Sequence, residues 1–490
     1  MAIFRRRVQS AVRVIISSGT EKPGLRMREL QVWKFGGTSL GTGERIRNAA
    51  KLVAEALRTR DLVVVCSAMG DTTDHLMAVA DAASRGDAQK AIETVRKLRE
   101  EHLKASREAV EDADVRSEVE SFVAARTEEL EKVATSASLL REVTERTRDL
   151  IASFGERLST KIFWGALRSM GVDAVYVEGG EAGIVTDDAF GNANPLMPLT
   201  AQLLKERLGK LLSDGKVPVV TGYIAANRDG VTTTLGRGGS DYTATLIAYS
   251  LDAKEVWLWT DVDGMMSADP RVVRTARVLR RISYEEAVEM AYFGAKGLQI
   301  RTILPAKEKG ILIRIKNTFN PGAEGTAICD STDREMGVTK AVLFTKNVSM
   351  LTVKGDVLKG GALSARVLTV LEQLKVVPLM ISQSVSSASI SVVLPRPMTD
   401  IVVRGLEREV IGELGGGELE VERDVAAIAV IGEGMKGTPG VASKVFTAVA
   451  KRGINVRMIA QGSSELNISF VVKERDSEEA VRAVHEAFIG

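Results

Sequence analysis

The stretch Val231–Ala248, VTTTLGRGGSDYTATLIA, says most about how this chain folds. A run of threonines leads into a glycine-rich turn, Gly236–Gly239, and the residues after it have the spacing of an apolar helical face. Ser240 and Asp241 are typical N-cap residues, so we expect the helix to begin there. Glycines let a ligand approach the backbone, a helix start offers N–H groups to an anion, and Arg237 offers a planar fork to a carboxylate. Spacing alone supports an anion site and a plain turn that caps a buried helix equally well.

The composition is typical of a globular protein of several domains. The chain has 490 residues, of which 45% are hydrophobic and 27% are charged. Lys and Arg total 66 and Asp and Glu total 64, and this balance argues against a dedicated nucleic-acid or membrane binder. Two cysteines and three histidines argue against a disulfide framework and a zinc site, so we expect a cytoplasmic protein.

The first 30 residues differ from the rest of the chain. They carry seven basic residues against two acidic ones, and an apolar run follows the arginines. This is similar to a weak targeting segment, but Arg13 interrupts the apolar run and no clear cleavage site follows. We interpret residues 1–30 as a basic N-terminal extension without an assigned function.

Residues 31–325 repeat a strand–loop–helix pattern. Continuous apolar runs that alternate with helices are typical of a parallel sheet in an α/β domain. The charged helical residues 87–149 are expected to form a solvated face, and Ser153–Ser159, with its glycine and acid, is expected to interrupt them. The expected strands are Gln31–Phe35, Leu62–Cys66, Val172–Val177, Val217–Thr221, Glu255–Trp259 and Leu312–Lys316.

The last 150 residues contain an internal repeat at a constant offset of 78 residues, from 380 to 458. Met380–Gln383 matches Met458–Gln461, and Ile390–Val393 matches Ile468–Val471. Each copy is predicted to be strand, glycine loop, helix, strand, strand, which gives two small α+β units at 335–415 and 425–490. A GxGxxG occurs at Gly432–Gly437, but the next strand lacks the acid that a dinucleotide site needs. The repeat also accounts for these glycines.

Several motifs coincide in a combination that is specific to one family. They are KFGGTS at Lys34–Ser39, FGERLS at Phe154–Ser159, TTTLGRGGSD at Thr232–Asp241, TDVDGMMSADPR at Thr260–Arg271, FGAK at Phe293–Lys296 and KNTFNP at Lys316–Pro321. From about Arg28 to its end, the chain resembles an aspartate kinase, or aspartokinase. The resemblance implies an amino-acid-kinase fold, a mainly parallel sheet sandwiched by helices, followed by two ACT domains. It also implies phosphoryl transfer from ATP to the side-chain carboxylate of L-aspartate, so that the nucleophile belongs to the substrate.

The resemblance assigns catalytic roles to Lys34 and Asp241. Lys34 would contact the transferring phosphoryl group, and the backbone N–H groups of Gly36 and Gly37 would approach the same oxygens. Asp241 would orient Lys34 or the metal-bound phosphate. Without the motifs, Lys34 would be interpreted as a strand-end surface lysine and Asp241 as a helix cap.

Six further positions match residues that line the amino-acid site. Arg237 would hold a carboxylate of aspartate as a bidentate pair, and Glu156 would meet the substrate ammonium group. The other four are Ser67, Thr73, Tyr223 and Ser240.

The nucleotide positions implied by the resemblance follow the first expected strand and the later ones. Mg²⁺ would bridge the phosphates of ATP, and the sequence contains no dedicated metal site. The chain departs from the family at Met266, where a tyrosine is common, and at Gln299-Ile300, where His-Pro is common. The implied nucleotide residues are Gly36, Gly37, Thr260, Asp261, Met266, Arg271 and Lys296.

The ACT pair implies feedback by an amino-acid end product, lysine or threonine. Gln383 and Gln461 are repeat-equivalent and match positions that can contact such an effector. The copies differ nearby, because Ser387 and Ser389 stand where the second copy has Glu465 and Asn467, which leaves open whether both bind a ligand. A homodimer or homotetramer is expected by resemblance.

Two alternatives remain from the sequence. One is another enzyme of the amino-acid-kinase fold, acting on glutamate, acetylglutamate or a nucleotide. The other is a catalytically impaired homologue that serves as an amino-acid sensor. The joint presence of Lys34, Glu156, Arg237 and Asp241 argues against the sensor, and FGERLS with two ACT units argues against the other substrates.

Overall fold

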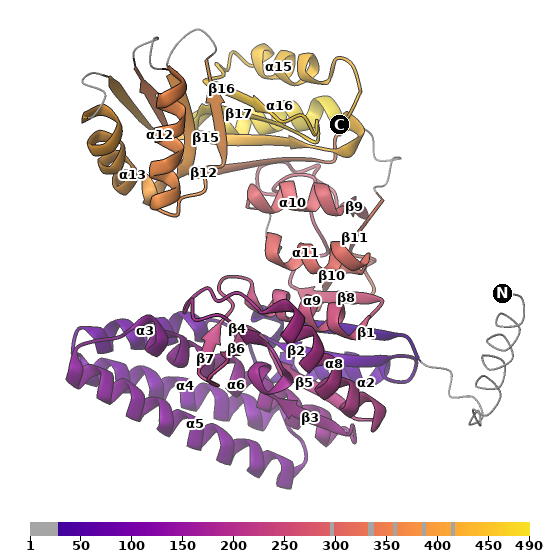
Figure 1. The fold of residues 1–490 in the computed structure, drawn as a ribbon. Helices are drawn as coiled ribbons and strands as arrows, with labels where there is room; N and C mark the ends of the chain where they lie inside the picture. Colours follow the sequence, from indigo (N-terminus) through magenta and orange to yellow (C-terminus); the bar gives the residue numbers. More distant parts are fainter. Residues whose placement is uncertain (1–27, 295–297, 332–337, 356–359, 385–388, 413–416) are drawn as a thin grey trace, which may run out of the picture.

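The structure is a computed structural model that describes residues 28–294, 298–331, 338–355, 360–384, 389–412 and 417–490. The chain forms a large α/β unit, to which we refer as the kinase unit, and a C-terminal antiparallel sheet with its own helices (Figure 1). The first 27 residues of the expected N-terminal extension lie outside the described residues. None of the described helices is long and apolar enough to cross a membrane.

The kinase unit is organised around an eight-stranded sheet that confirms the expected α/β class. All neighbouring strands are parallel except β10 and β11. β11 follows residue 325 and still belongs to this sheet. In sheet order the strands are β3 (Ala174–Val177), β5 (Val217–Thr221), β2 (Asp61–Cys66), β1 (Leu30–Phe35), β8 (Glu255–Thr260), β10 (Leu312–Asn317), β11 (Thr326–Cys329) and β9 (Arg281–Ser283).

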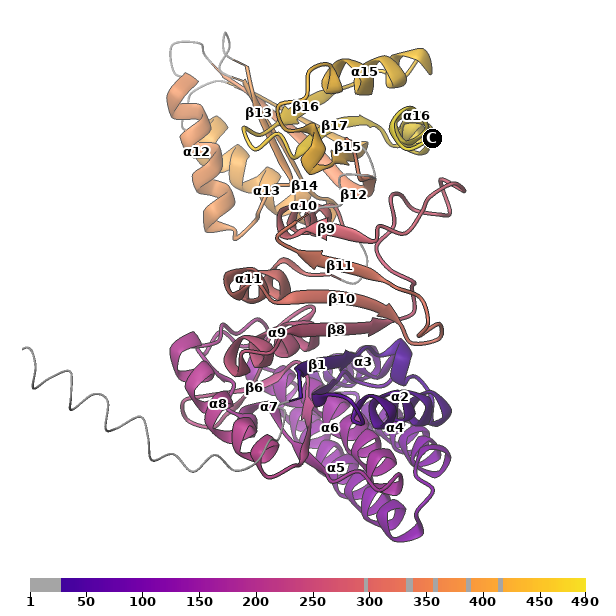
Figure 2. The same cartoon turned by 90° about the vertical axis from the view of Figure 1, so that its right-hand side faces the viewer.

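Helices cover both faces of this sheet, because its central strands are apolar on both sides. Val63 and Val65 of β2 pack with α8, α9 and α11, whereas Val64 and Cys66 face α2, α4 and α6. Figure 2 shows α8, α9 and α11 on one side of the strands and α2, α4, α5 and α6 on the other. The helices are α2 (Gly43–Ala56), α3 (Thr72–Ser84), α4 (Ala88–Ala109), α5 (Ala113–Leu140), α6 (Glu145–Ser169), α7 (Gly179–Ala182), α8 (Met197–Ser213), α9 (Gly239–Leu251), α10 (Tyr284–Tyr292) and α11 (Ile300–Lys309).

The expected interruption at Ser153–Ser159 is wrong, because α6 runs through this segment without a break. Gly155 lies inside the helix for a packing reason. A Cβ atom on Gly155 would stand 2.8 Å from the Cβ of Ala68, in the loop after β2. The glycine therefore lets α6 approach that loop and costs the helix some intrinsic stability.

A small sheet beside the main one contains the threonine run. β6 (Ile224–Asn227) pairs with β7 (Thr232–Thr234) as an antiparallel hairpin and with β4 (Val185–Thr186) in parallel. This hairpin leads directly into the glycine-rich turn and α9, and thereby places the turn at the carboxyl ends of the main strands.

The two C-terminal copies join into one six-stranded antiparallel sheet. The offset of 78 holds for β13 and β16 and for β14 and β17, whereas β12 and β15 are offset by 77, and each copy carries a second helix that the repeat did not predict. Arg396 and Glu474, which are repeat-equivalent, form an ion pair of 2.6 Å between the copies. The first unit contains β12 (Ala341–Lys354), α12 (Gly360–Gln373), β13 (Met380–Gln383), β14 (Ser389–Pro395) and α13 (Thr399–Leu406), and the second unit contains β15 (Glu418–Ile431), α15 (Val441–Lys451), β16 (Met458–Gln461), β17 (Asn467–Lys473) and α16 (Ser477–Phe488).

Candidate active site

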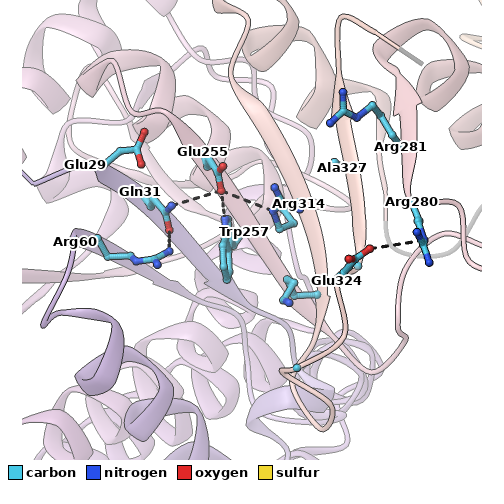
Figure 3. Close-up of a pocket in the computed structure, with 13 residues that line it drawn as sticks. Glu29, Gln31, Arg60, Glu255, Trp257, Arg280, Arg281, Arg314, Glu324 and Ala327 are labelled. Carbon is cyan, nitrogen blue, oxygen red and sulfur yellow. Dashed lines mark hydrogen bonds and ion pairs between the residues drawn. The ribbon is translucent and has the colours of Figure 1, made fainter. Parts of the chain in front are cut away.

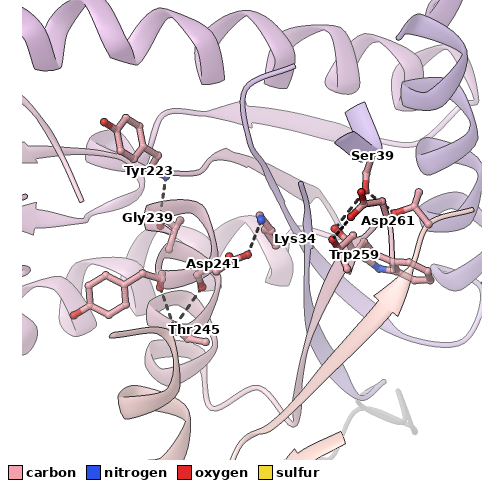
Figure 4. Close-up of polar contacts among 12 residues, drawn as sticks. Lys34, Ser39, Tyr223, Gly239, Asp241, Thr245, Trp259 and Asp261 are labelled. Carbon is pink, nitrogen blue, oxygen red and sulfur yellow. Dashed lines mark hydrogen bonds and ion pairs between the residues drawn. The ribbon is translucent and has the colours of Figure 1, made fainter. Parts of the chain in front are cut away.

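The centre of the candidate site is an ion pair between Lys34 and Asp241. Lys34 lies next to the end of β1, in the middle of the sheet between β2 and β8. Its Nζ is 2.5 Å from Asp241 Oδ1, and only 12% and 11% of the two side chains are exposed (Figure 4). This ion pair is largely shielded from water, so its charges interact strongly. It lies at the carboxyl ends of parallel strands, where open α/β sheets bind ligands.

Helix α9 begins slightly earlier than the sequence indicated. Its N-cap is Gly238, which has a positive φ of 73°, and no side chain caps the helix. The expectation that Ser240 and Asp241 form the N-cap is therefore wrong. Both lie in the first turn, and Asp241 is consequently free to face Lys34 near the positive end of the helix.

Glycines bring the loops after β1 and β2 into contact. The N–H of Gly36 donates to the Trp259 carbonyl at 3.1 Å, and that of Gly70 donates to the Gly37 carbonyl at 3.0 Å. A Cβ atom on Gly37 would stand 3.0 Å from the carbonyl oxygen of Ala68, so a side chain would push the loops apart. The KFGGTS glycines therefore form a close backbone surface beside Lys34.

Glu156 of α6 is the most perturbed acid near this pair. It is only 4% exposed, and burial raises its pKa to about 8, against the opposing effects of the Ala68 N–H and the Lys34 charge. Its Oε2 has no hydrogen-bond partner among the described residues. A buried carboxylate oxygen without a partner is costly, so this position is suited to a cationic ligand group.

Tyr223 and Ser240 pack tightly at the start of α9. Tyr223 has a positive φ of 65°, and its backbone N–H donates to Thr243 Oγ1 at 3.1 Å. A Cβ atom on Gly222 would lie 2.6 Å from Ser240 Oγ, which shows how close β5 comes to the helix. Burial raises the pKa of the Tyr223 phenol to about 12, so this side chain stays neutral.

Ser67 and Thr73 lie on the loop and helix that follow β2. The Ser67 N–H donates to the Phe35 carbonyl at 3.0 Å, and its carbonyl accepts from Ser159 Oγ at 2.6 Å. Thr73 is in the first turn of α3 and is half-buried. The structure thus brings Ser67 beside β1 and α6, which carry Lys34 and Glu156.

Arg237 is exposed at the tip of the glycine-rich turn. Gly236 and Gly238 on either side both have a φ of 73°, which favours glycine at these positions. No hydrogen bond or ion pair joins Arg237 to any residue that the structure describes. Its guanidinium is therefore available for an external anion.

Only some of the predicted nucleotide residues lie near the Lys34–Asp241 pair. Thr260 and Asp261 follow β8, with Thr260 Oγ1 3.1 Å from Asp261 Oδ1, near Ser39 and Trp259 (Figure 4). Met266 forms a bridge with Val278 instead, and Arg271 is 76% exposed and pairs with Asp269 at 2.6 Å. Lys296 lies outside the described residues.

The predicted effector residues occupy equivalent places in the C-terminal sheet. Gln383 and Gln461 are the last residues of β13 and β16, and both are exposed. Their strands are the two edges of the sheet, which come close together. Ser387 of the first copy is outside the described residues.

Sequence reasoning missed Asp149 and Arg301, which hold the site together. The buried carboxylate of Asp149 accepts from the N–H of Thr234 at 2.9 Å and from Thr234 Oγ1 at 2.7 Å. Asp149 is seven residues before Glu156, so the two acids share one face of α6, a spacing that could have drawn attention to it. Arg301 is bonded to the turn from α11, and no sequence signal marked it.

A cavity of about 1040 Å³ lies elsewhere, on the face of the sheet formed by β1, β8 and β10 (Figure 3). Trp257 stacks on Trp33 there with ring centroids 4.9 Å apart, and Arg60 lies 5.4 Å from the Trp257 ring. Glu255 accepts from the Trp257 indole and pairs with Arg314 at 3.8 Å. The described residues that line this cavity include none of the predicted site residues.

Comparison with known proteins agrees with the fold. Residues 29–317 match the amino acid kinase family and residues 428–488 match the ACT domain. Aspartokinase 1, chloroplastic, of Arabidopsis thaliana is 34% identical over 93% of this chain and 80% of that protein. The aspartokinase of Schizosaccharomyces pombe is 31% identical over 94% of this chain and 92% of its own length.

Solved structures give the same result. E. coli aspartokinase III in complex with aspartate and ADP (R-state) has a TM-score of 0.79 and 31% identity, covering 94% of this chain and 99% of that one. The same enzyme in complex with lysine and aspartate (T-state) has a TM-score of 0.74 at 31% identity, covering 94% of this chain and 100% of that one. The chain therefore belongs to the aspartokinase family, and its enzyme class is aspartate kinase, a phosphotransferase with a carboxyl group as acceptor.

Proposed function

We propose that the chain converts ATP and L-aspartate to ADP and 4-phospho-L-aspartate at the Lys34–Asp241 pair, as the first step towards lysine, threonine and methionine. The observation that carries this assignment is the buried pair, with Lys34 Nζ 2.5 Å from Asp241 Oδ1, beside the unpartnered carboxylate oxygen of Glu156. The site offers a cation in Lys34, an acceptor for an ammonium group in Glu156 and an available guanidinium in Arg237. These groups suit a substrate with two carboxylates and an amine.

In the proposed reaction, an oxygen of the aspartate side chain attacks the γ-phosphorus of ATP. A new P–O bond forms as the bond from the γ-phosphorus to its bridging oxygen breaks, and ADP leaves with that electron pair. The attacking carboxylate is already ionised at neutral pH, so no base is needed. Lys34 offsets the charge on the transferring group, and Asp241 holds the Lys34 ammonium in place.

The amino-acid end of the substrate would lie between Glu156 and Arg237. The Glu156 carboxylate would accept the substrate ammonium, and Arg237 would take a carboxylate through both of its terminal nitrogens. Ser67, Thr73, Tyr223 and Ser240 would provide the walls and the remaining hydrogen bonds. Among these groups, Glu156 should give the clearest change in a pH profile, because its pKa of about 8 lies within the pH range in which the enzyme can be assayed.

ATP and Mg²⁺ would bind at the ends of β1 and β8, against Gly36, Gly37, Thr260 and Asp261, with Met266, Arg271 and Lys296 as further proposed contacts. The described residues contain no group of three or more metal-binding side chains. Mg²⁺ would therefore be held mainly by phosphates and water, and Asp261 is the one carboxylate among the proposed nucleotide contacts. The ion supplies charge neutralisation on the nucleotide.

Regulation is proposed to act through the C-terminal sheet. Lysine or threonine would bind near Gln383 or Gln461 and inhibit the kinase, in a homodimer or homotetramer located in the cytoplasm. The loop after β15 offers a physical route, because the N–H of Glu433 donates to Glu286 Oε1 of α10 at 2.7 Å. In support, the related E. coli enzyme has been solved with lysine and aspartate.

The test is hydroxamate formation from aspartate, Mg-ATP and hydroxylamine, with lysine or threonine added in parallel. The wild-type protein should form product, and Lys34→Ala should lose about 100- to 1000-fold in kcat. Lys51→Ala, an exposed lysine on α2, is the matched control and should keep full activity. Absence of product from the folded wild-type protein would reject the proposal.

The role of Glu156 can be tested separately by the pH profile. Its raised pKa means that the free enzyme carries a neutral Glu156 below about pH 8, and binding of an ammonium group favours the ionised form. The KM for aspartate should therefore fall as pH rises towards 8 and then level off. Glu156→Gln should raise this KM and remove the trend, whereas an unchanged trend would contradict the assignment.

A further inference from the structure

Arg301 is hydrogen-bonded to two separate segments around the glycine-rich turn. It is the second residue of α11 and is half-buried. Its NH1 donates to the Leu235 carbonyl at 3.0 Å and to Asn192 Oδ1 at 2.6 Å. Its NH2 donates to the Ala193 carbonyl at 2.9 Å and to Asn194 Oδ1 at 3.1 Å. The guanidinium thereby joins α11 to the end of β7 and to the loop before α8.

The fifth contact of Arg301 is with α9 itself. The guanidinium carbon lies 4.9 Å from the ring centroid of Tyr242, which follows Asp241 in the first turns of the helix. All four hydrogen-bond acceptors are neutral oxygens, two from the backbone and two from asparagines. The two terminal nitrogens are thus occupied by the protein, and the side chain is not free to bind a substrate carboxylate.

These contacts fix the peptide that precedes the turn. Leu235 is held at both ends, since its N–H donates to the Tyr223 carbonyl at 2.9 Å and its carbonyl accepts from Arg301. A Cβ atom on Gly236 would stand 2.4 Å from Asn192 Oδ1, so the asparagine that Arg301 holds also limits where the turn can go. Arg237 is the second residue after Leu235.

We infer that Arg301 is a positioning residue that pre-orders the Gly236–Gly239 turn and so sets the place of Arg237. Two glycines with positive φ make this turn flexible in itself, and ordering it during binding would weaken the affinity for aspartate. The contacts of Arg301, to which we refer as the clamp, order the turn before the substrate binds, so binding does not carry this entropic cost. The inference rests on the proposed function, because it takes Arg237 as the group that holds the aspartate carboxylate.

The experiment compares KM values for the two substrates in Arg301→Gln, Arg301→Lys and the wild type. Arg301→Gln should raise the KM for aspartate by roughly tenfold or more, the range for losing hydrogen bonds to a charged group. The KM for ATP should change by less than about twofold. Arg301→Lys should also raise the KM for aspartate, because one ammonium cannot span the four oxygens that the planar fork reaches.

Arg207→Gln is the matched control. Arg207, inside α8, also bonds backbone carbonyls in the kinase unit, but those of Gly180 and Glu181 in α7, and among the described residues no hydrogen bond joins it to the glycine-rich turn. Its replacement should leave both KM values unchanged. Equal increases in the two KM values of the Arg301 variants, or a lower melting temperature with unchanged KM values, would overturn the inference.

Asn192→Ala keeps the test decisive if Arg301→Gln does not fold. Asn192→Ala removes one of the four acceptors, so in the wild type it should raise the KM for aspartate by a smaller factor than Arg301→Gln does. In the Arg301→Lys background the contact is already weakened, so the same change should raise this KM by a smaller factor than it does in the wild type. Equal factors in both backgrounds would contradict the clamp. An inactive wild-type protein would instead reject the proposed function, so the two failures are distinguishable.

Discussion

The first and second C-terminal units share their order of elements and their repeat offset, but they differ in what lies against their helices. The core of the second unit, around Val445 and Phe470, includes Ala268 and Val273 from the kinase loop that follows β8. The corresponding core of the first unit, around Val367 and Val392, includes no described residue of the kinase unit. On the helix side of the sheet, the second copy therefore shares its core with the enzyme and the first copy does not. On the other face, both copies pack with the kinase core, the first through Val348 and Val393.

The side-chain contacts of two repeat positions differ in the same way, although the backbone N–H of Val342 in the first unit also donates to the Ser267 carbonyl at 2.8 Å. His485 of α16 is 2.9 Å from Ser267 Oγ, and Asn467 Nδ2 donates to Glu289 Oε2 of α10 at 2.9 Å. The repeat-equivalent positions in the first unit carry Glu407, which is exposed, and Ser389. The departure between the copies at Ser389 and Asn467 thus has a structural reason, because the second copy carries the side chain that reaches the kinase unit.

The largest expected effect comes from creating a cavity at equivalent positions in the helix-side cores of the two units. Val445 and Val367 are fully buried, so each change to alanine should cost about 2 kcal/mol of local stability. All four tryptophans lie in the kinase unit, at 33, 164, 257 and 259, so their fluorescence reports on its unfolding alone. Val445→Ala should lower the fluorescence midpoint and the temperature at which activity is lost, and Val367→Ala should leave both close to wild type. Equal shifts in the two variants would remove the distinction.

The parallel sheet could be predicted because its central strands are buried on both faces. Val217–Thr221 is a continuous apolar run that needs no knowledge of its neighbours, and it became β5 with the same bounds. Gly155 was misinterpreted for the opposite reason. Its place inside α6 depends on Ala68, a contact in space that local sequence does not reveal.

The site was predictable only where a motif marked it. Lys34 and Asp241 were named from the resemblance, and neither one indicates the other by spacing, since they meet only when β1 and α9 pack together. Arg301 belongs to no motif, and its role depends on four oxygens that two segments, residues 192–194 and Leu235, bring to one place. Met266 and Arg271 show a further limit. Their loop also packs against the second unit, so a motif match alone does not say which neighbour each side chain contacts.

A smaller effect is expected from the pH dependence of the His485 contact. Burial, together with the Arg277 charge, lowers the pKa of His485 below its ordinary value of 6.5, so the docked form keeps the neutral ring. The contact should therefore be fully present above about pH 6.5 and weaken as pH falls, because the undocked form takes up the proton first. The fluorescence midpoint of wild type should fall towards that of His485→Gln on acidification. Other acidic transitions, such as that of His102, occur in both proteins and cancel in the difference.

The matched control for this measurement is Glu407→Gln in the first unit, which should not alter the fluorescence midpoint at any pH in that range. A constant difference between wild type and His485→Gln across the range would show that the ring does not titrate between docked and undocked forms. The contact would then contribute packing alone.

The smallest expected effect is that of exchanging the residues at which the copies differ. Asn467→Ser should remove the hydrogen bond to Glu289 and lower the fluorescence midpoint by an amount equivalent to about 0.5–1 kcal/mol, whereas Ser389→Asn should change nothing in the kinase unit. Asn467 also accepts from Ser469 Oγ at 2.9 Å, so the single change reports on two contacts. A double-mutant cycle with Glu289→Ala isolates the one that crosses between the units. A coupling energy near zero would mean that the shared core around Val445, and not this polar contact, is what joins the second copy to the kinase.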